Sequence, residues 1–203
     1  MIFFHIFVPT TSHNAMKYLS FFILLFIGEL SVSAQHMFSR QFPFFNQLSS
    51  NEIFSIHQDR EGYFWIGTTN GLARYDGYQL NTFRTDYKNQ NLLTDNGITA
   101  INDNDLYVWI GTWKGLNLYN KQTCRITPFS DARLLDKVVD AITVDKDGNV
   151  WVSAGGMIYR CDSTAHIIKE YEVGNIQEGY AISNIYVDQQ KQLWAVGSRG
   201  IFR

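Results

Sequence analysis

The sequence of 203 residues has little excess charge and few cysteines. Its 17 basic and 19 acidic residues give a net charge of −2. A nucleic-acid groove needs a clustered basic surface, so this balance argues against a nucleic-acid partner. The cysteines, Cys124 and Cys161, lie at different distances from the repeated tryptophans described below. We therefore expect two separate small hydrophobic residues and no disulfide between them.

The motifs of common catalytic and metal sites are also missing. There is no GxSxG motif and no phosphate-binding loop, and His36, His57 and His166 lack the spacing of metal ligands. The segment DKDGN, residues 145–149, resembles the first half of a calcium loop, but it lacks the later oxygen ligands and the terminal Glu. A hairpin turn is the better interpretation. We predict no catalytic residue, no metal and no cofactor.

What the sequence does contain is an internal repeat. Trp65, Trp109, Trp151 and Trp194 are separated by 44, 42 and 43 residues, and WIGTTNGL at the first returns as WIGTWKGL at the second. An Asp lies six residues before each Trp, and glycines recur around them. The residues assigned to the repeat are Asp59, Gly62, Trp65, Gly67, Gly71, Asp103, Trp109, Gly111, Gly115, Asp145, Gly148, Trp151, Asp188 and Trp194.

One unit reads as four strands joined by turns. IFSIHQD, YFWIGT, LARY and YQLNTF are rich in β-branched and aromatic residues. Asn70-Gly71 and Asp76-Gly77 are dipeptides typical of tight hairpins, because such turns need positive φ, which Gly and Asn tolerate best. The unit is predicted to be an antiparallel four-stranded meander.

The middle strands are apolar on both faces, as in Phe64-Trp65-Ile66, so each sheet needs a neighbour on either side. Sheets stacked around an axis meet this need, and a period in the low forties is typical of propeller blades. We expect an all-β fold: an incomplete β-propeller of four-stranded antiparallel blades. Three complete blades and part of a fourth are predicted, at residues 51–94, 95–136, 137–180 and 181–203, with the last ending in its third strand.

The amino terminus differs in composition from the repeats. From Met16, a possible start, one Lys precedes an apolar stretch that ends in small residues. Residues 1–34 are predicted to be a signal peptide, cleaved after Ala34. An uncleaved anchor at residues 17–34 is the alternative. Residues 35–50 are either a strap packed on the first blade or a strand that closes the ring.

The first unit, IFSIHQDREGYFWIGTTNGLARYDGYQLNTFR, closely resembles the two-component regulator propeller repeat, and residues 138–162 resemble it more loosely. The resemblance extends over residues 38–203. It implies the periplasmic sensor half of a hybrid two-component sensor histidine kinase of Bacteroidetes-type bacteria, which detects oligosaccharides to control glycan-utilisation genes. The chain would be an amino-terminal fragment of a homodimeric, inner-membrane-anchored protein, without its transmembrane helix, its kinase and the rest of its propeller.

Candidate ligand contacts follow from propeller geometry. Turns between second and third strands meet the inter-blade loops at one face, here residues 87–96, 131–137 and 174–180. The ligand-binding candidates on the turns are Asn70, Trp113, Lys114 and Arg199. Trp113 replaces a Thr of the first copy, and an exposed Trp beside Lys suits stacking on a sugar ring. Alternatively, Trp113 fills the gap between blades.

Two other functions remain open from the sequence. An exported propeller enzyme, such as a glycan lyase or glycosidase, needs acid or base side chains that converge on the axial face, and Glu178 with Tyr180 is the nearest pair. A scaffold for protein partners is the third possibility. The repeated Asp residues are expected to form turns rather than to act as acids or metal ligands.

Overall fold

A computed structural model describes residues 41–85, 92–173 and 182–203. The chain divides into two compact units, Met1–Gln41 and Phe42–Arg203, and the second unit contains all the strands given below. The predicted signal peptide and the rest of residues 1–40 lie outside the described residues. Within the described ranges, no helix is long and apolar enough to cross a membrane.

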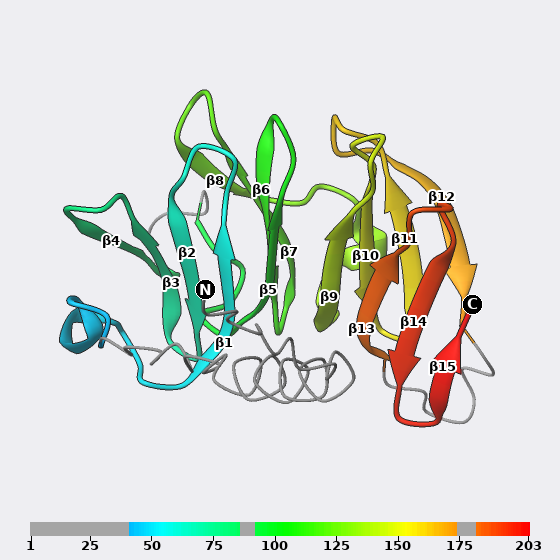
Figure 1. Ribbon diagram of the computed structural model, residues 1–203, viewed down its shortest axis with the longest axis horizontal. Coiled ribbons are helices and arrows are strands. Elements are labelled where there is room, and N and C mark those ends of the chain that lie inside the picture. Colours follow the sequence, from blue (N-terminus) through cyan, green and yellow to red (C-terminus); the bar gives the residue numbers. More distant parts are fainter. Residues whose placement is uncertain (1–40, 86–91, 174–181) are drawn as a thin grey trace, which may run out of the picture. The chain divides into compact units, whose positions relative to one another are not determined.

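The second unit consists of four antiparallel sheets that follow one another along the chain (Figure 1). The first three have four strands each and the fourth has three, each in sequence order. Sheet 1 contains β1 (Ile53–Gln58), β2 (Phe64–Thr68), β3 (Gly71–Tyr75) and β4 (Leu80–Phe83). Sheet 2 contains β5 (Ile98–Asp103), β6 (Tyr107–Thr112), β7 (Gly115–Asn120) and β8 (Arg125–Pro128). Sheet 3 contains β9 (Val139–Val144), β10 (Val150–Ala154), β11 (Met157–Cys161) and β12 (Ile167–Glu172). Sheet 4 contains β13 (Ile182–Val187), β14 (Leu193–Gly197) and β15 (Gly200–Phe202).

The hairpins follow from the turn chemistry of the sequence. Gly71 and Gly77 have φ of +132° and +97°, which disfavour a side chain. The Asp76 carboxylate accepts hydrogen bonds from the backbone N–H groups of Tyr78 and Gln79, at 2.8 and 2.7 Å. The DKDGN segment is likewise a turn, closed by a bond from Asp145 N–H to Asn149 O. The predicted four-stranded meander is therefore confirmed.

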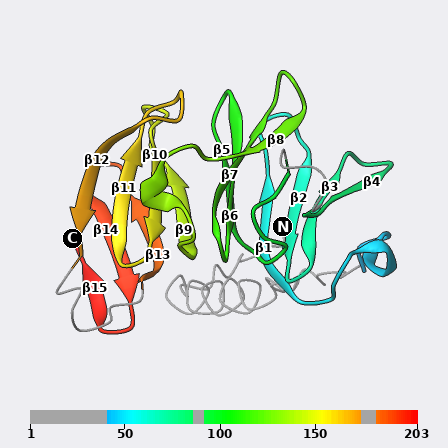
Figure 2. The ribbon, with the colours of Figure 1, turned by 180° about the vertical axis from the view of Figure 1, so that it is seen from behind.

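The core lies between successive sheets. Three clusters of buried side chains join sheet 1 to sheet 2, sheet 2 to sheet 3, and sheet 3 to sheet 4. Trp65 and Trp109 are fully buried in these layers and Trp151 is 7% exposed. The first strands of neighbouring sheets, β1, β5, β9 and β13, contact one another in series, as the view from behind also shows (Figure 2). The arrangement is all-β and propeller-like.

Two repeat glycines let the sheets approach closely. A Cβ atom on Gly67 would lie 2.6 Å from Cγ2 of Ile98 in the next sheet, and one on Gly111 would lie 2.6 Å from Cγ1 of Val139. Neither position has room for a side chain without displacement of its neighbour. Sheet 3 has Ser153 at this register position, and its hydroxyl is buried without a hydrogen-bond partner among the described residues.

The segment before sheet 1 contains one short 3-10 helix, η1 (Phe45–Gln47), and no strand in residues 41–50. The rings of Phe42 and Phe44 lie 5.0 and 5.2 Å from the ring of Tyr75 on β3. This segment thus packs against sheet 1.

The first strand of each sheet has a bulge, and the side chain of the bulged residue on β5 reaches the next sheet. On β5 this residue is Thr99, whose hydroxyl donates to Val139 O at 2.5 Å. On β9 it is Asp140, which forms no hydrogen bond or ion pair with a described residue. Burial raises the pKa of Asp140 to about 6. A protonated Asp140 can donate a hydrogen bond, as Thr99 does to Val139 O, whereas the carboxylate can only accept. The residue of β13 that corresponds to Val139 in the strand register is Ile182, so its backbone carbonyl is the equivalent acceptor.

We predict that Asp140 makes the stability of the protein depend on pH. A folded-state pKa above the unfolded value means that this contribution is complete at acid pH and is lost as pH rises through about 6. Between about pH 4 and 7 the free energy of unfolding should fall by about 2 kcal/mol. Asp140→Thr, which copies Thr99, should remove this part of the slope in urea titrations followed by tryptophan fluorescence. Equal slopes for both proteins would contradict the assignment.

Candidate functional site

Trp113 lies in the turn between β6 and β7 and is 44% exposed. Its backbone N–H donates to Gly97 O at 3.1 Å, and its indole covers Gly97 so closely that a Cβ there would lie 2.4 Å from the ring. The ring centroid of Phe54, from sheet 1, lies 6.3 Å from that of Trp113, and Phe54 is itself 57% exposed. Trp113 thus contacts Phe54 of the neighbouring sheet and still exposes part of its ring to solvent.

Lys114 follows Trp113 in the same turn. Its side chain is 66% exposed, and its ammonium lies 3.8 Å from the carboxylate of Asp95. An aromatic face beside a cation and a carboxylate can stack on a sugar ring and bond its hydroxyl groups. We call Trp113, Lys114, Phe54 and Asp95 the Trp113 patch.

The other two predicted ligand contacts lie on other turns. Asn70, between β2 and β3, donates to Ser49 O at 3.2 Å and accepts a hydrogen bond from Arg84, so its amide holds neighbouring segments together. Arg199 is exposed in the turn between β14 and β15. The structure therefore joins Trp113 and Lys114 in one patch and leaves Asn70 and Arg199 on separate turns.

The sequence interpretation did not name Phe54 or Asp95 as ligand contacts, although Asp95 lies in the predicted loop 87–96. Phe54 stands at the bulge position that Thr99, Asp140 and Ser183 occupy in the other sheets, so its aromatic character was a signal in the repeat alignment. Of the predicted loops, residues 92–96 and 131–137 are described, whereas residues 87–91 and 174–180 lie outside the described residues. Glu178 and Tyr180 of the enzyme hypothesis are among the latter.

Three of the four repeat Asp residues share one role. The Asp59 carboxylate accepts from the backbone N–H groups of Glu61 and Tyr63 and, at 2.7 Å, from the indole N–H of Trp65. Asp145 and Asp188 make the same contacts in sheets 3 and 4, with indole bonds of 3.1 and 2.8 Å. As predicted, these residues form turns.

Asp103 does not belong to this set, which corrects the assignment made from spacing. Asp103 pairs with Val108 inside sheet 2, as Gln58 pairs with Phe64 in sheet 1. The turn residue of sheet 2 is Asn104, which accepts from the N–H groups of Leu106 and Tyr107. The turn of sheet 2 is one residue shorter, so a fixed offset from Trp109 points to the wrong residue.

Asp103 instead joins sheets 1 and 2. Its oxygens lie 2.7 Å from Nε2 of His57 and 2.7 Å from Nζ of Lys121, and the side chains of Asp103 and Lys121 are only 5% and 6% exposed. Burial alone would raise the pKa of Asp103, but the hydrogen bonds from His57 and Lys121 outweigh it and lower the pKa to about 2. The buried ion pair of Asp103 and Lys121 lies within sheet 2, and the contact of Asp103 with His57 joins it to sheet 1.

Sheet 2 also leaves its tryptophan without a partner. The indole N–H of Trp109 is buried and has no hydrogen-bond acceptor among the described residues. An amide at Asn104 explains this, because its oxygen is occupied by the turn and its nitrogen, which donates to Ser163 O at 3.2 Å, cannot accept. Among the described residues, no group of three acidic, His or Cys residues is placed to hold a metal.

Comparison with protein families gives a match to the first unit. The model of the two component regulator propeller family matches residues 47–70. This span begins before β1 and contains the turn residue Asp59, the buried Trp65 and the Asn70 turn. Residues 47–70 are therefore similar to a two component regulator propeller repeat. No curated protein sequence matches the chain.

Solved structures of extracellular domains of hybrid two component systems have a similar fold. The extracellular domain assigned to the hybrid two component system BT4673 from B. thetaiotaomicron superposes with a TM-score of 0.61 at 22% identity. That of the system BT3049 from the same organism gives 0.60 at 23% identity. Each comparison covers 76% of this chain and 21% of the other, so the chain spans about a fifth of those domains. Virginiamycin B lyase from Staphylococcus aureus gives 0.56 at 17% identity, over 74% of this chain and 54% of the lyase.

We predict that Asp103→Asn destabilises the protein at neutral pH. The change leaves the buried ammonium of Lys121 without its counter-charge, which should cost about 3 kcal/mol in the free energy of unfolding. Because the pKa of Asp103 is lowered, its contribution is complete above about pH 4 and is lost as pH falls through about 2. Urea titrations at both ends of this range measure the effect.

The matched control is Asp105→Asn, because the side chain of Asp105 is 81% exposed and, among the residues that the structure describes, forms an ion pair with Arg60 alone. This variant should unfold within about 0.5 kcal/mol of the unmodified protein. If Asp103→Asn behaves like Asp105→Asn at neutral pH, the cluster does not hold the sheets together.

Proposed function

We propose that this chain is part of the extracytoplasmic sensor of a hybrid two-component histidine kinase and that it takes part in binding oligosaccharides. The observation that carries the proposal is the two component regulator propeller repeat at residues 47–70, in a fold similar to extracellular domains of hybrid two component systems. In this proposal the full-length protein is a periplasmic, inner-membrane-anchored homodimer. Its kinase, on another part of the protein, controls genes for glycan use.

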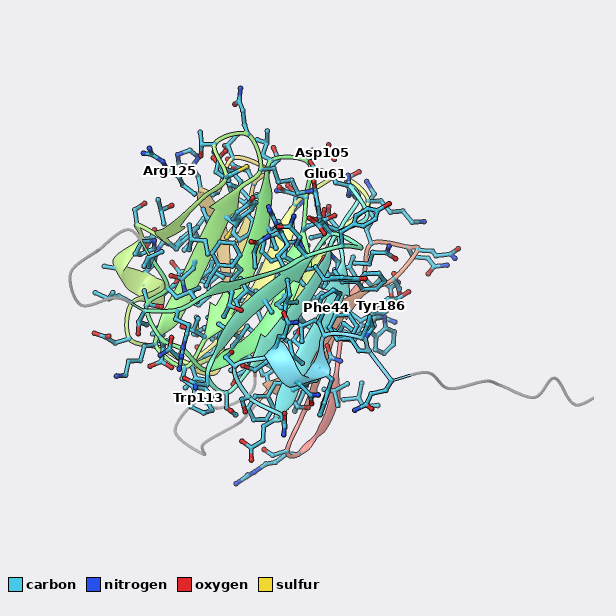
Figure 3. The ribbon with its side chains drawn as sticks, turned by 90° about the vertical axis from the view of Figure 1, so that its left-hand side faces the viewer. Phe44, Glu61, Asp105, Trp113, Arg125 and Tyr186 are labelled. Carbon is cyan, nitrogen blue, oxygen red and sulfur yellow. The ribbon has the colours of Figure 1, made fainter. Side chains whose placement is uncertain are left out.

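The Trp113 patch supports a role in binding. Trp113, in the turn between β6 and β7, lies at the end of the sheets opposite to Glu61, Asp105 and Arg125 (Figure 3). The two exposed rings offer stacking surface, and Lys114 with Asp95 offers a donor and an acceptor for hydroxyl groups. In this sensor, ligand binding would change how the propellers pack in the dimer. No catalytic step is needed.

A second candidate is an exported propeller enzyme, which the likeness of fold to virginiamycin B lyase favours. It requires acid or base side chains that converge at one face. Incubation of the protein with polysaccharides tests it, since a lyase forms unsaturated products and a glycosidase new reducing ends. If neither product forms, this candidate is excluded for the polysaccharides used.

We predict that Trp113→Thr, which copies Thr69 of the first sheet, weakens oligosaccharide binding by about tenfold through loss of the stacking surface. Calorimetric titration with a panel of short neutral and acidic oligosaccharides measures the change. Tyr78→Ala is the control, because Tyr78 is 86% exposed in the turn between β3 and β4, away from the patch. Equal affinity for the Trp113→Thr protein and the unmodified protein would remove the patch from the binding site.

A further inference from the structure

Sheet 2 departs from the other sheets at one further position, opposite its tryptophan. The residue paired with Trp65 is Arg74 and the residue paired with Trp151 is Arg160. Their guanidinium groups lie over the indoles at 5.8 and 5.2 Å, and Arg203 lies over Trp194 at 6.0 Å. In sheet 2 the residue paired with Trp109 is Leu118.

An arginine at this position fills the space between two sheets. Arg74 lies 4.9 Å from the ring of Tyr63 and donates to the hydroxyl of Tyr119, in sheet 2, at 2.5 Å. Leucine is shorter and has no polar group. Where sheet 2 carries Leu118, the structure has a hollow of about 530 Å³. Its lining residues are Tyr107, Leu118, Asn120, Thr123, Arg125 and Thr127.

The lining of this hollow offers hydrogen-bond donors and a cation but no carboxylate. Arg125 forms no ion pair with any residue that the structure describes. The oxygen of Asn120 already accepts from the N–H groups of Gln122 and Thr123, which leaves its amide nitrogen as a donor. Thr123 and Thr127 add two hydroxyl groups, and Tyr107 and Leu118 add an aromatic and an apolar wall.

We propose that this hollow binds a small molecule that carries a carboxylate, with Arg125 as its charged partner. A guanidinium and a carboxylate match in geometry, because two parallel N–H groups can donate to the two oxygens. The hydroxyl groups and the Asn120 amide orient the rest of the ligand, and the wall formed by Tyr107 and Leu118 holds its body.

This site is distinct from the Trp113 patch and does not rest on the proposed function. Arg125 and Trp113 lie at opposite ends of the sheets (Figure 3). Each residue of the hollow belongs to sheet 2 or to its turns: Tyr107 to β6, Leu118 and Asn120 to β7, Thr123 to the following turn, and Arg125 and Thr127 to β8. A rigid sheet therefore positions all the donors.

Calorimetric titration with D-glucuronate and D-glucose tests the proposal, since the two sugars differ by the carboxylate. The protein should bind glucuronate at least about tenfold more tightly than glucose. Two variants locate the site. Leu118→Arg places in sheet 2 the side chain that Arg74 and Arg160 place in their sheets and so fills the hollow, while Arg125→Gln removes the cation from the surface.

Each variant should lower the affinity for glucuronate by about tenfold or more. Lys169→Gln is the matched control, because Lys169 is an exposed cation on β12 that does not line the hollow. The Lys169→Gln protein should bind glucuronate with the affinity of the unmodified protein. Equal binding of glucose and glucuronate, or glucuronate binding that survives both Leu118→Arg and Arg125→Gln, would overturn the proposal.

Discussion

The structure depends on the burial of each sheet against its neighbours. The middle strands have no polar face, so a single sheet would expose an apolar layer on either side. Register positions show the effect directly. Ile101 and Ile142, which face a preceding sheet, are 7% and 9% exposed, whereas Ile56 of sheet 1 is 68% exposed. On the other side, Leu72 is fully buried and its counterpart Ile201 in sheet 4 is 69% exposed. Contact between sheets, more than pairing within them, gives the fold its core.

Most of this architecture could be predicted because its signals are local. Turn dipeptides such as Asn70-Gly71 specify hairpins by backbone conformation alone, and a tryptophan repeated at nearly constant spacing indicates a unit that stacks on copies of itself. The close approach of sheets at Gly67 and Gly111 also left a trace in the sequence, since both were recognised as repeat glycines. What could not be predicted locally is the register. A turn shorter by one residue moved the structural role from Asp103 to Asn104 without a change in residue type at the expected offset.

The candidate site shows the same division. Trp113 could be recognised because it replaces Thr69 of an otherwise similar turn. The positions of Phe54 and Asp95 beside Trp113 could not be predicted, because Phe54 comes from another sheet and Asp95 from the loop between sheets, and only the packing brings them together. The cluster of His57, Asp103 and Lys121 joins residues 46 and 18 positions apart in the sequence. Such contacts depend on how strands from different repeats align, which no periodicity encodes.

In a repeat protein, the positions that stay constant maintain the fold, and the copy that departs from them shows where other constraints act. Sheet 2 departs at three linked places. Its turn amide leaves Trp109 without an acceptor, its displaced acid ties it to sheet 1, and Leu118 opens a hollow where other sheets have arginine. The unpaired indole is a cost to stability, since a buried N–H without a partner is unfavourable. The contact of Asp103 with His57 of sheet 1 links the two sheets at another point, so sheet 2 keeps its place in the stack while its surface differs from that of its neighbours.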